Sequence, residues 1–184
     1  KAVPVDQRTG KRLWEQSKDV RHFIGNDQAE PVFQKTGLTS YNQKRFFTYK
    51  TVKKIHWTPP DGVWEIHFFF EEEIQEFKYY GTFVDPCHSE AVETFIELTH
   101  DRYRRAIGDD FGITVKGIFT DEIGLLGRYP WSSQLLEAFK KKNGYDLVDY
   151  LPALLYSTHP SAPKIRYDYF QTMHLLLRQT YHQH

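Results

Sequence analysis

Asp121 and Glu122 are the residues of this chain with the clearest potential for chemistry, because they come directly after an apolar run. The run includes Ile113, Val115 and residues 117–120 (GIFT), and it has the composition of a buried strand. In parallel barrels the catalytic groups lie at the C-terminal ends of such strands, so an acidic pair at this point is typical of an acid/base site. The alternative is that Asp121 caps the next element and that Glu122 faces water, as most carboxylates do.

Four segments around this pair occur in a distinctive order and spacing. They are VDPCHSEAVETFIELTHDRYRRAIGDDFG (84–112), TVKGIFTDE (114–122), PWSSQLLEAFKKKNGYDLVDYLPAL (130–154) and IRYDYF (165–170). Together they resemble the catalytic region of bacterial glycoside hydrolases of the alpha-L-rhamnosidase-like type. The resemblance extends from about Thr58 to the C-terminus if residues 57–66 (WTPPDGVWEI) are the family's strand pair with tryptophan and proline.

This resemblance implies a (β/α)8 barrel, a carbohydrate substrate, hydrolysis with inversion, and a candidate catalytic acid at the glutamate of the TDE motif, which is Glu122 here. It also implies a dependence on calcium. The family usually has an aspartate-aromatic-leucine-asparagine stretch where this chain has Asp85, Pro86, Cys87 and His88. Asp85 matches the first position of that stretch, and we predict that it binds substrate.

Hydrolysis of a glycosidic bond requires two carboxyl groups that flank the bond. One protonates the leaving oxygen, and the other activates water or attacks the anomeric carbon. Neighbouring side chains on a strand point to opposite faces, so Asp121 and Glu122 are poor candidates for being this pair. We predict that Glu122 is the acid and that Asp121 supports it or binds a substrate hydroxyl. The partner carboxylate is expected at another strand end, in a region of the family that this chain lacks.

Aromatic residues follow the acidic pair. Trp131, preceded by Tyr129 and Pro130, is at the position of a loop at the barrel mouth. A flat aromatic ring there can stack on the apolar face of a sugar, so Trp131 and Tyr129 are predicted to bind substrate. The alternative is that Trp131 is a hydrophobic anchor that fixes the loop to the following helix.

The chain has 184 residues, whereas a complete barrel needs about 250. We therefore expect an α/β protein: a partial (β/α)8 TIM-barrel segment with an N-terminal β-hairpin region, belonging to a longer enzyme and inactive alone. Residues 1–45 are predicted to be irregular with short strands, 46–83 to be a strand and hairpin region, and 84–184 to be the barrel segment. The alternative function is a non-catalytic carbohydrate-binding or structural domain on the same scaffold.

Local patterns predict the elements of these regions. Alternating apolar residues over 47–57 and 64–70, separated by the turn 59–62 (PPDG), predict a β-hairpin. Apolar stripes with capping residues predict helices over residues 89–107, 132–143 and 165–180, the first capped by Ser89 and the second ended by Gly144.

Composition excludes several classes of partner. The 24 basic and 24 acidic residues give a formal net charge of zero, so nothing indicates binding to nucleic acid or to an anionic membrane. No run approaches the roughly 18 apolar residues of a membrane span. The sequence leaves open whether the protein is cytoplasmic or exported, and it leaves the oligomeric state undetermined.

Two further motifs have plain alternatives. Cys87 is the single cysteine, and with His88 beside it the thiol could be a nucleophile, but adjacent residues rarely reach the required geometry, so an unreactive thiol is preferred. The run Glu71–Glu72–Glu73 could suggest a calcium site. Consecutive strand residues point to opposite faces, so we assign no metal ligand and prefer a solvated strand end.

Overall fold

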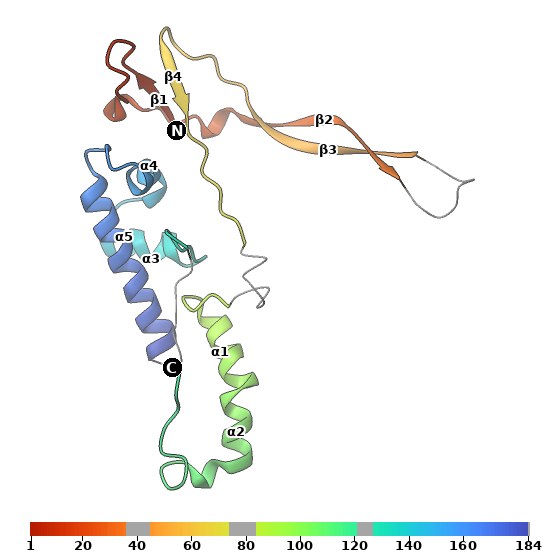
Figure 1. Cartoon of the computed structure of the whole chain (residues 1–184), viewed down its shortest axis with the longest axis vertical. Helices are drawn as coiled ribbons and strands as arrows, with labels where there is room; N and C mark the ends of the chain where they lie inside the picture. Colours follow the sequence, from red (N-terminus) through yellow and green to blue (C-terminus); the bar gives the residue numbers. More distant parts are fainter. Residues whose placement is uncertain (36–44, 74–83, 121–126, 184) are drawn as a thin grey trace. The chain divides into compact units, whose positions relative to one another are not determined.

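The computed structural model describes residues 1–35, 45–73, 84–120 and 127–183 (Figure 1). Contacts within the chain divide it into two compact units, Lys1–Phe68 and Phe69–His184. Strands of the described residues form small antiparallel sheets in the first unit, and helices dominate the second. The predicted mixture of α and β structure is therefore confirmed. A (β/α)8 barrel is not formed by the residues that the structure describes.

The first sheet of the N-terminal unit pairs strand β1 (Ala2–Val5) with strand β4 (Val63–Ile66). The pairing is antiparallel, with Ala2 opposite Ile66. Val3 in β1 is fully buried, and Trp14 is 6% exposed. Small apolar cores of this kind gain stability roughly in proportion to the apolar area removed from water. The β1–β4 sheet is thus held by a few buried side chains.

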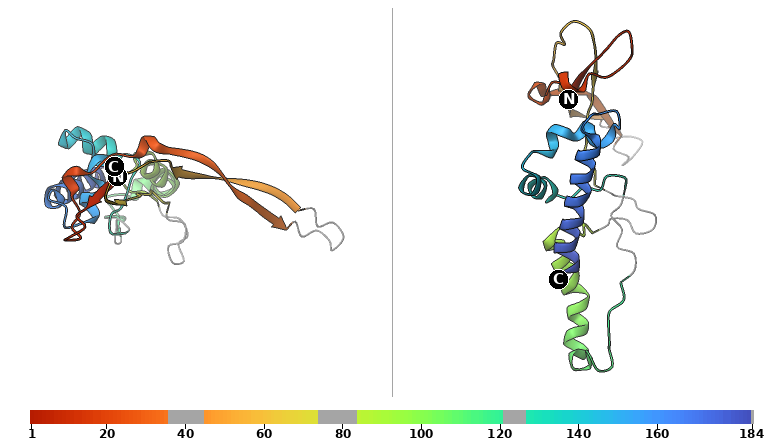
Figure 2. Two further views of the ribbon diagram at one scale, coloured as in Figure 1. Left: turned by 90° about the horizontal axis from the view of Figure 1, so that it is seen from above. Right: turned by 90° about the vertical axis from the view of Figure 1, so that its left-hand side faces the viewer.

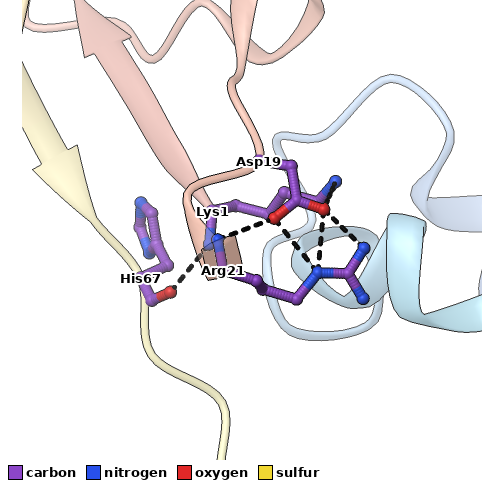
Figure 3. A network of polar contacts seen from close by, with 4 residues as sticks. All are labelled: Lys1, Asp19, Arg21 and His67. Atoms are coloured by element: carbon purple, nitrogen blue, oxygen red, sulfur yellow. Dashed lines mark hydrogen bonds and ion pairs between the residues drawn. The ribbon is translucent and has the colours of Figure 1, made fainter. Parts of the chain in front are cut away.

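A polar network adds to this unit around Asp19 (Figure 3). The Lys1 backbone nitrogen donates to the His67 carbonyl at 3.1 Å, which continues the β1–β4 ladder by one residue. Arg21 Nε lies 2.8 Å from Asp19 Oδ2 and 3.0 Å from Asp19 Oδ1, and Lys1 Nζ lies 3.7 Å from Oδ2. The hydrogen bonds from the Arg21 side chain hold the pKa of Asp19 well below its ordinary value.

This depressed pKa predicts a pH-dependent stability. Because the folded state favours the ionised Asp19, its contribution is fully present above the unfolded-state pKa of about 3.9 and is lost as the pH falls through the lower, folded-state pKa. Asp19→Asn should therefore lower the unfolding temperature at pH 7, and the difference from the parent should shrink as the pH is lowered below about 4. Thermal unfolding followed by circular dichroism measures this.

The matched control for this experiment is Asp61→Asn, because Asp61 is an exposed carboxylate in the turn before β4. The Asp61→Asn variant should unfold at the same temperature as the parent at pH 7 and at pH 3. A loss of the same size at pH 7 and at pH 3 in Asp19→Asn would contradict the assignment, because it would mean that the ionised form has no special role.

The second sheet pairs the long strands β2 (Ile24–Lys35) and β3 (Arg45–Ile55), which form a two-stranded ribbon that twists along its length (Figure 2). The register shifts between Gln28 and Pro31, where two residues of β2 oppose one of β3. A proline cannot donate to a ladder and is tolerated at an edge or a bulge, which explains the shift at this point.

The predicted hairpin is wrong in its partners. Residues 47–57 were expected to pair with 64–70, but β3 pairs with β2 and β4 pairs with β1. The turn at Pro59–Gly62 does form a compact bend, since Trp64 Nε1 donates to the Pro60 carbonyl at 3.0 Å. Residues 1–45, expected to be irregular with short strands, in fact supply β1 and the twelve-residue β2.

In the C-terminal unit, the predicted helix over residues 89–107 forms as two helices, α1 (Ser89–Leu98) and α2 (His100–Ile107). The break is at Thr99, which has φ −114° and ψ −79°. The Thr99 hydroxyl and the Thr99 backbone N–H both donate to the Phe95 carbonyl, at 2.5 Å and 3.1 Å. The first residue outside α1 is His88, not Ser89, and its Nδ1 accepts from the Ala91 amide.

Three later helices build the core of this unit. They are α3 (Leu135–Asn143), α4 (Leu151–Leu155) and α5 (Ala162–Leu177), and α3 and α4 both pack against α5 (Figures 1 and 2). As predicted, α3 ends at Gly144, whose φ of 78° is the left-handed conformation that glycine adopts at low cost. The buried residues of this core include Cys87, Leu135, Phe139, Leu154, Ile165, Tyr169, Met173 and Leu176.

The apolar run before the acidic pair is not the buried strand that its composition predicts. Ile113, Ile118 and Phe119 are 71%, 63% and 87% exposed. An isolated bridge joins Phe111 to Val115, and no strand is formed over residues 113–120. A buried strand needs neighbours that bond its N–H and C=O groups, and within the described ranges no strand lies beside this run.

Candidate functional site

The predicted catalytic residues Asp121 and Glu122 lie outside the described residues. Thr120, which directly precedes Asp121, is the last described residue before them. Its Oγ1 lies 3.3 Å from the Tyr181 hydroxyl oxygen, a hydrogen bond longer than the usual range of about 2.5 to 3.0 Å between hydroxyl groups. Since the two residues are 61 positions apart, this contact is a tertiary one.

Asp85, predicted to bind substrate, lies in a turn at the start of α1. Its Oδ1 accepts from the Cys87 amide at 2.9 Å, and its carbonyl accepts from the His88 amide at 3.1 Å. The side chain is half-buried. The Asp85 carboxylate is therefore fixed by its own turn through one oxygen, which is the usual geometry of an aspartate that initiates a turn.

One short helical segment contacts both Thr120 and the Asp85 turn. The π-helical turn η5 (Arg178–His182) continues α5. In it, Thr180 Oγ1 lies 2.6 Å from the Pro86 carbonyl oxygen and 2.8 Å from the Leu176 carbonyl oxygen. The next residue, Tyr181, contacts Thr120. The structure thus brings the Asp85 turn and the residue before the acidic pair to the same turn of helix.

Tyr129 and Trp131 pack on the helical core of the C-terminal unit. The Tyr129 hydroxyl donates to the Leu154 carbonyl, and its ring centroid lies 5.9 Å from that of Tyr169. Tyr169 in turn donates to the Pro130 carbonyl. These contacts anchor the loop 129–131 to α4 and α5. Both aromatic residues remain half-buried, and sugar binding by either of them stays a prediction.

Cys87 has the environment of an unreactive thiol. It is fully buried, and burial, followed by the charge of Asp85, raises the pKa of the thiol to about 12. His88 uses Nδ1 to accept the Ala91 amide at the start of α1. Because the thiolate is the nucleophilic form, a cysteine with a raised pKa is poorly suited to nucleophilic catalysis.

The described residues also bear on metal and membrane binding. Glu71, Glu72 and Glu73 are exposed along a segment without regular secondary structure. Among the described residues, no group of three or more His, Cys, Asp or Glu side chains is placed to hold a metal ion. The described helices also include none that is both long and apolar enough to cross a membrane.

Sequence reasoning did not single out Tyr181, and it assigned Thr180 to an apolar stripe. The available clue was a hydroxyl residue at a core position, since Thr180 follows Ile165, Tyr169 and Leu176 on the buried side of the helix. A buried hydroxyl is expected to have a hydrogen-bond partner. That partner is the carbonyl of Pro86, which is 94 positions away from Thr180 in the sequence.

The comparison with protein families agrees with the motifs around the acidic pair. The model of glycoside hydrolase family 106, described as alpha-L-rhamnosidase, matches residues 48–184, a span that begins in β3 and includes every candidate site residue. Comparisons with curated proteins and with solved structures give no match. The family match covers well over half of the chain, and the chain therefore belongs to the alpha-L-rhamnosidase family of glycoside hydrolases.

Proposed function

We propose that this chain is part of the catalytic domain of an enzyme that hydrolyses α-L-rhamnosidic bonds in a rhamnose-containing or related polysaccharide. The observation that supports this most is the family match over residues 48–184, which includes the TDE motif. The contacts of η5 with the Asp85 turn and with Thr120 add support, because they bring two candidate parts of the site together.

In this proposal Glu122 is the general acid that protonates the leaving glycosidic oxygen. Asp121 orients Glu122 or binds a hydroxyl group of the substrate. A second carboxylate from another strand end activates water on the opposite face of the sugar, giving inversion, and the two carboxyl groups would be about 6.5 to 9.5 Å apart. Asp85, Tyr129 and Trp131 would contact the sugar.

The exposed apolar run before Asp121 supports a role for this chain within a larger (β/α)8 barrel. Ile118 and Val115 line a groove of about 870 Å³ together with Tyr103 and Ile107 of α2. Exposing large apolar side chains to water is unfavourable, and neighbouring strands of a barrel would bury them. We propose that those neighbours cover residues 113–119 in the complete enzyme.

The calcium dependence implied by the family resemblance stays a prediction. Calcium takes six to eight oxygen ligands from side chains and carbonyls that converge on the ion. The described carboxylates form no such group. No step of the proposed reaction is therefore assigned to a metal.

The test of this function is hydrolysis by the complete polypeptide that contains the chain, measured on a panel of 4-nitrophenyl glycosides. The α-L-rhamnoside should have the highest kcat/KM of the panel, because the family is described as alpha-L-rhamnosidase. Saturable binding of rhamnosides without turnover of any panel member would instead support a carbohydrate-binding domain. Preferred turnover of another sugar would retain the hydrolase and reject the assigned substrate.

A further inference from the structure

Two consecutive hydroxyl-bearing side chains of η5 contact two different loops of the candidate site. Thr180 contacts the Pro86 carbonyl in the Asp85 turn, and Tyr181 contacts Thr120, the neighbour of Asp121. Consecutive residues of a helix project in different directions, so a single turn can reach both loops. We call the four residues Pro86, Thr120, Thr180 and Tyr181 the hydroxyl clasp.

The two contacts of the clasp differ in burial. Thr180 is 6% exposed, and its single hydroxyl hydrogen faces two carbonyl acceptors, of which Pro86 is the nearer. This is a structural bond of the kind that satisfies a buried polar group. The contact between Tyr181 and Thr120 is open to solvent. Its loss would leave no buried polar atom unpaired, so it adds little to stability.

The backbone around the clasp also departs from regular α-helix. The α5 helix ends at Leu177 and continues as the π-helical turn Arg178–His182. Widened turns of this kind are rare and frequently occur at functional sites. Here the turn carries Thr180 and Tyr181, whose hydroxyls reach the two loops.

We infer that Tyr181 is a positioning residue for the proposed reaction, acting through the Thr120 hydroxyl to fix the backbone directly before Asp121. This inference rests on the proposed function. Catalysis depends steeply on the placement of the reacting groups, and small displacements of a catalytic group lower kcat strongly. Thr180 fixes the Asp85 turn on the other side of the clasp, so that the two loops are held at a common turn of helix.

The test is a double-mutant cycle in the complete polypeptide with 4-nitrophenyl α-L-rhamnoside. Tyr181→Phe and Thr120→Val each remove one hydroxyl of the pair with little change of shape. Each should lower kcat about 3- to 10-fold with KM nearly unchanged, because the contact acts on the placement of the reacting groups. The double variant should be no slower than the slower single variant, because the two hydroxyls act through each other.

Two matched variants separate positioning from general structure. Thr120→Ser keeps the hydroxyl and should retain most of the parent's kcat. Tyr167→Phe removes the hydroxyl of a tyrosine in α5, the helix that η5 continues. Tyr167 is 65% exposed, and this variant should leave kcat unchanged. A merely structural role of Tyr181 would change the unfolding temperature without this separation of kcat from KM.

The outcomes distinguish this inference from the function on which it rests. Parent-like kcat in Tyr181→Phe, or losses that multiply in the double variant, would overturn the positioning role and leave the hydrolase in place. Absence of turnover by the parent on every glycoside would overturn the proposed function, and the positioning role with it.

Discussion

Replacing Glu122 with glutamine in the complete enzyme is expected to slow hydrolysis of rhamnosides with poor leaving groups by about 10² to 10⁴, the usual worth of a positioned general acid. Glutamine keeps the shape of the side chain and lacks the transferable proton. Activated aryl rhamnosides should be affected less, because their leaving oxygen needs little protonation. The measurement is kcat for a series of aryl rhamnosides that differ in the pKa of the released phenol.

The matched control is Glu137→Gln, an exposed glutamate in the first turn of α3. It should show parent rates throughout the series. A Glu122 that only caps a helix or faces water would give neither the loss nor the dependence on the leaving group. A uniform loss across the series would point to substrate binding or folding instead of acid catalysis.

The 184-residue chain alone is expected to show no turnover of aryl rhamnosides, whereas the complete polypeptide should hydrolyse them. One observation and one chemical requirement lead to this expectation. The run before Asp121 is exposed and unpaired with any described strand, and glycoside hydrolysis needs a second carboxylate facing the first. This loss should exceed that of any single substitution, because in the proposed function the other barrel strands and the second carboxylate both come from the rest of the enzyme.

This second prediction is checked by assaying the two purified polypeptides side by side at equal concentration. Circular dichroism of the short chain should retain the helical signal of α3 and α5, whose core is formed within residues 135–176. Turnover by the short chain that is abolished by Glu122→Gln would contradict the prediction. It would mean that both catalytic groups are within the chain.

The helices of the C-terminal unit could be predicted because their determinants are local. The stripe of Leu135 and Phe139 and the glycine at position 144 are within one segment, and α3 forms there. The break between α1 and α2 was missed because it is set by the backbone angles of one residue, Thr99, which apolar periodicity does not record.

Strand pairing could not be predicted, because the partners are distant in the sequence. The turn at residues 59–62 predicts a hairpin, yet β4 pairs with β1, which is at the start of the chain. The segment of β2, IGNDQAEPVFQK, lacks the alternation by which strands are recognised. The composition of residues 113–119 predicts a buried strand, but burial requires neighbours that the described residues do not supply.

The tertiary contacts of the candidate site could not be predicted either, because they also join residues that are distant in the sequence. The motif around Thr120 and Asp121 is visible in the sequence, and it lies within the residues that the family model matches. The contacts of Thr180 and Tyr181 with the two loops span 94 and 61 positions. No local pattern encodes such contacts, so the hydroxyl clasp emerges from the tertiary structure alone.

The catalytic role of Glu122 is tested most simply by the release of L-rhamnose from a natural α-L-rhamnosyl oligosaccharide by the complete enzyme and by its Glu122→Gln variant, with both proteins shown to be folded. The parent should release the sugar, and the variant should be slower by about 10² to 10⁴. Equal rates for the two folded proteins would contradict the assignment of Glu122 as the catalytic acid.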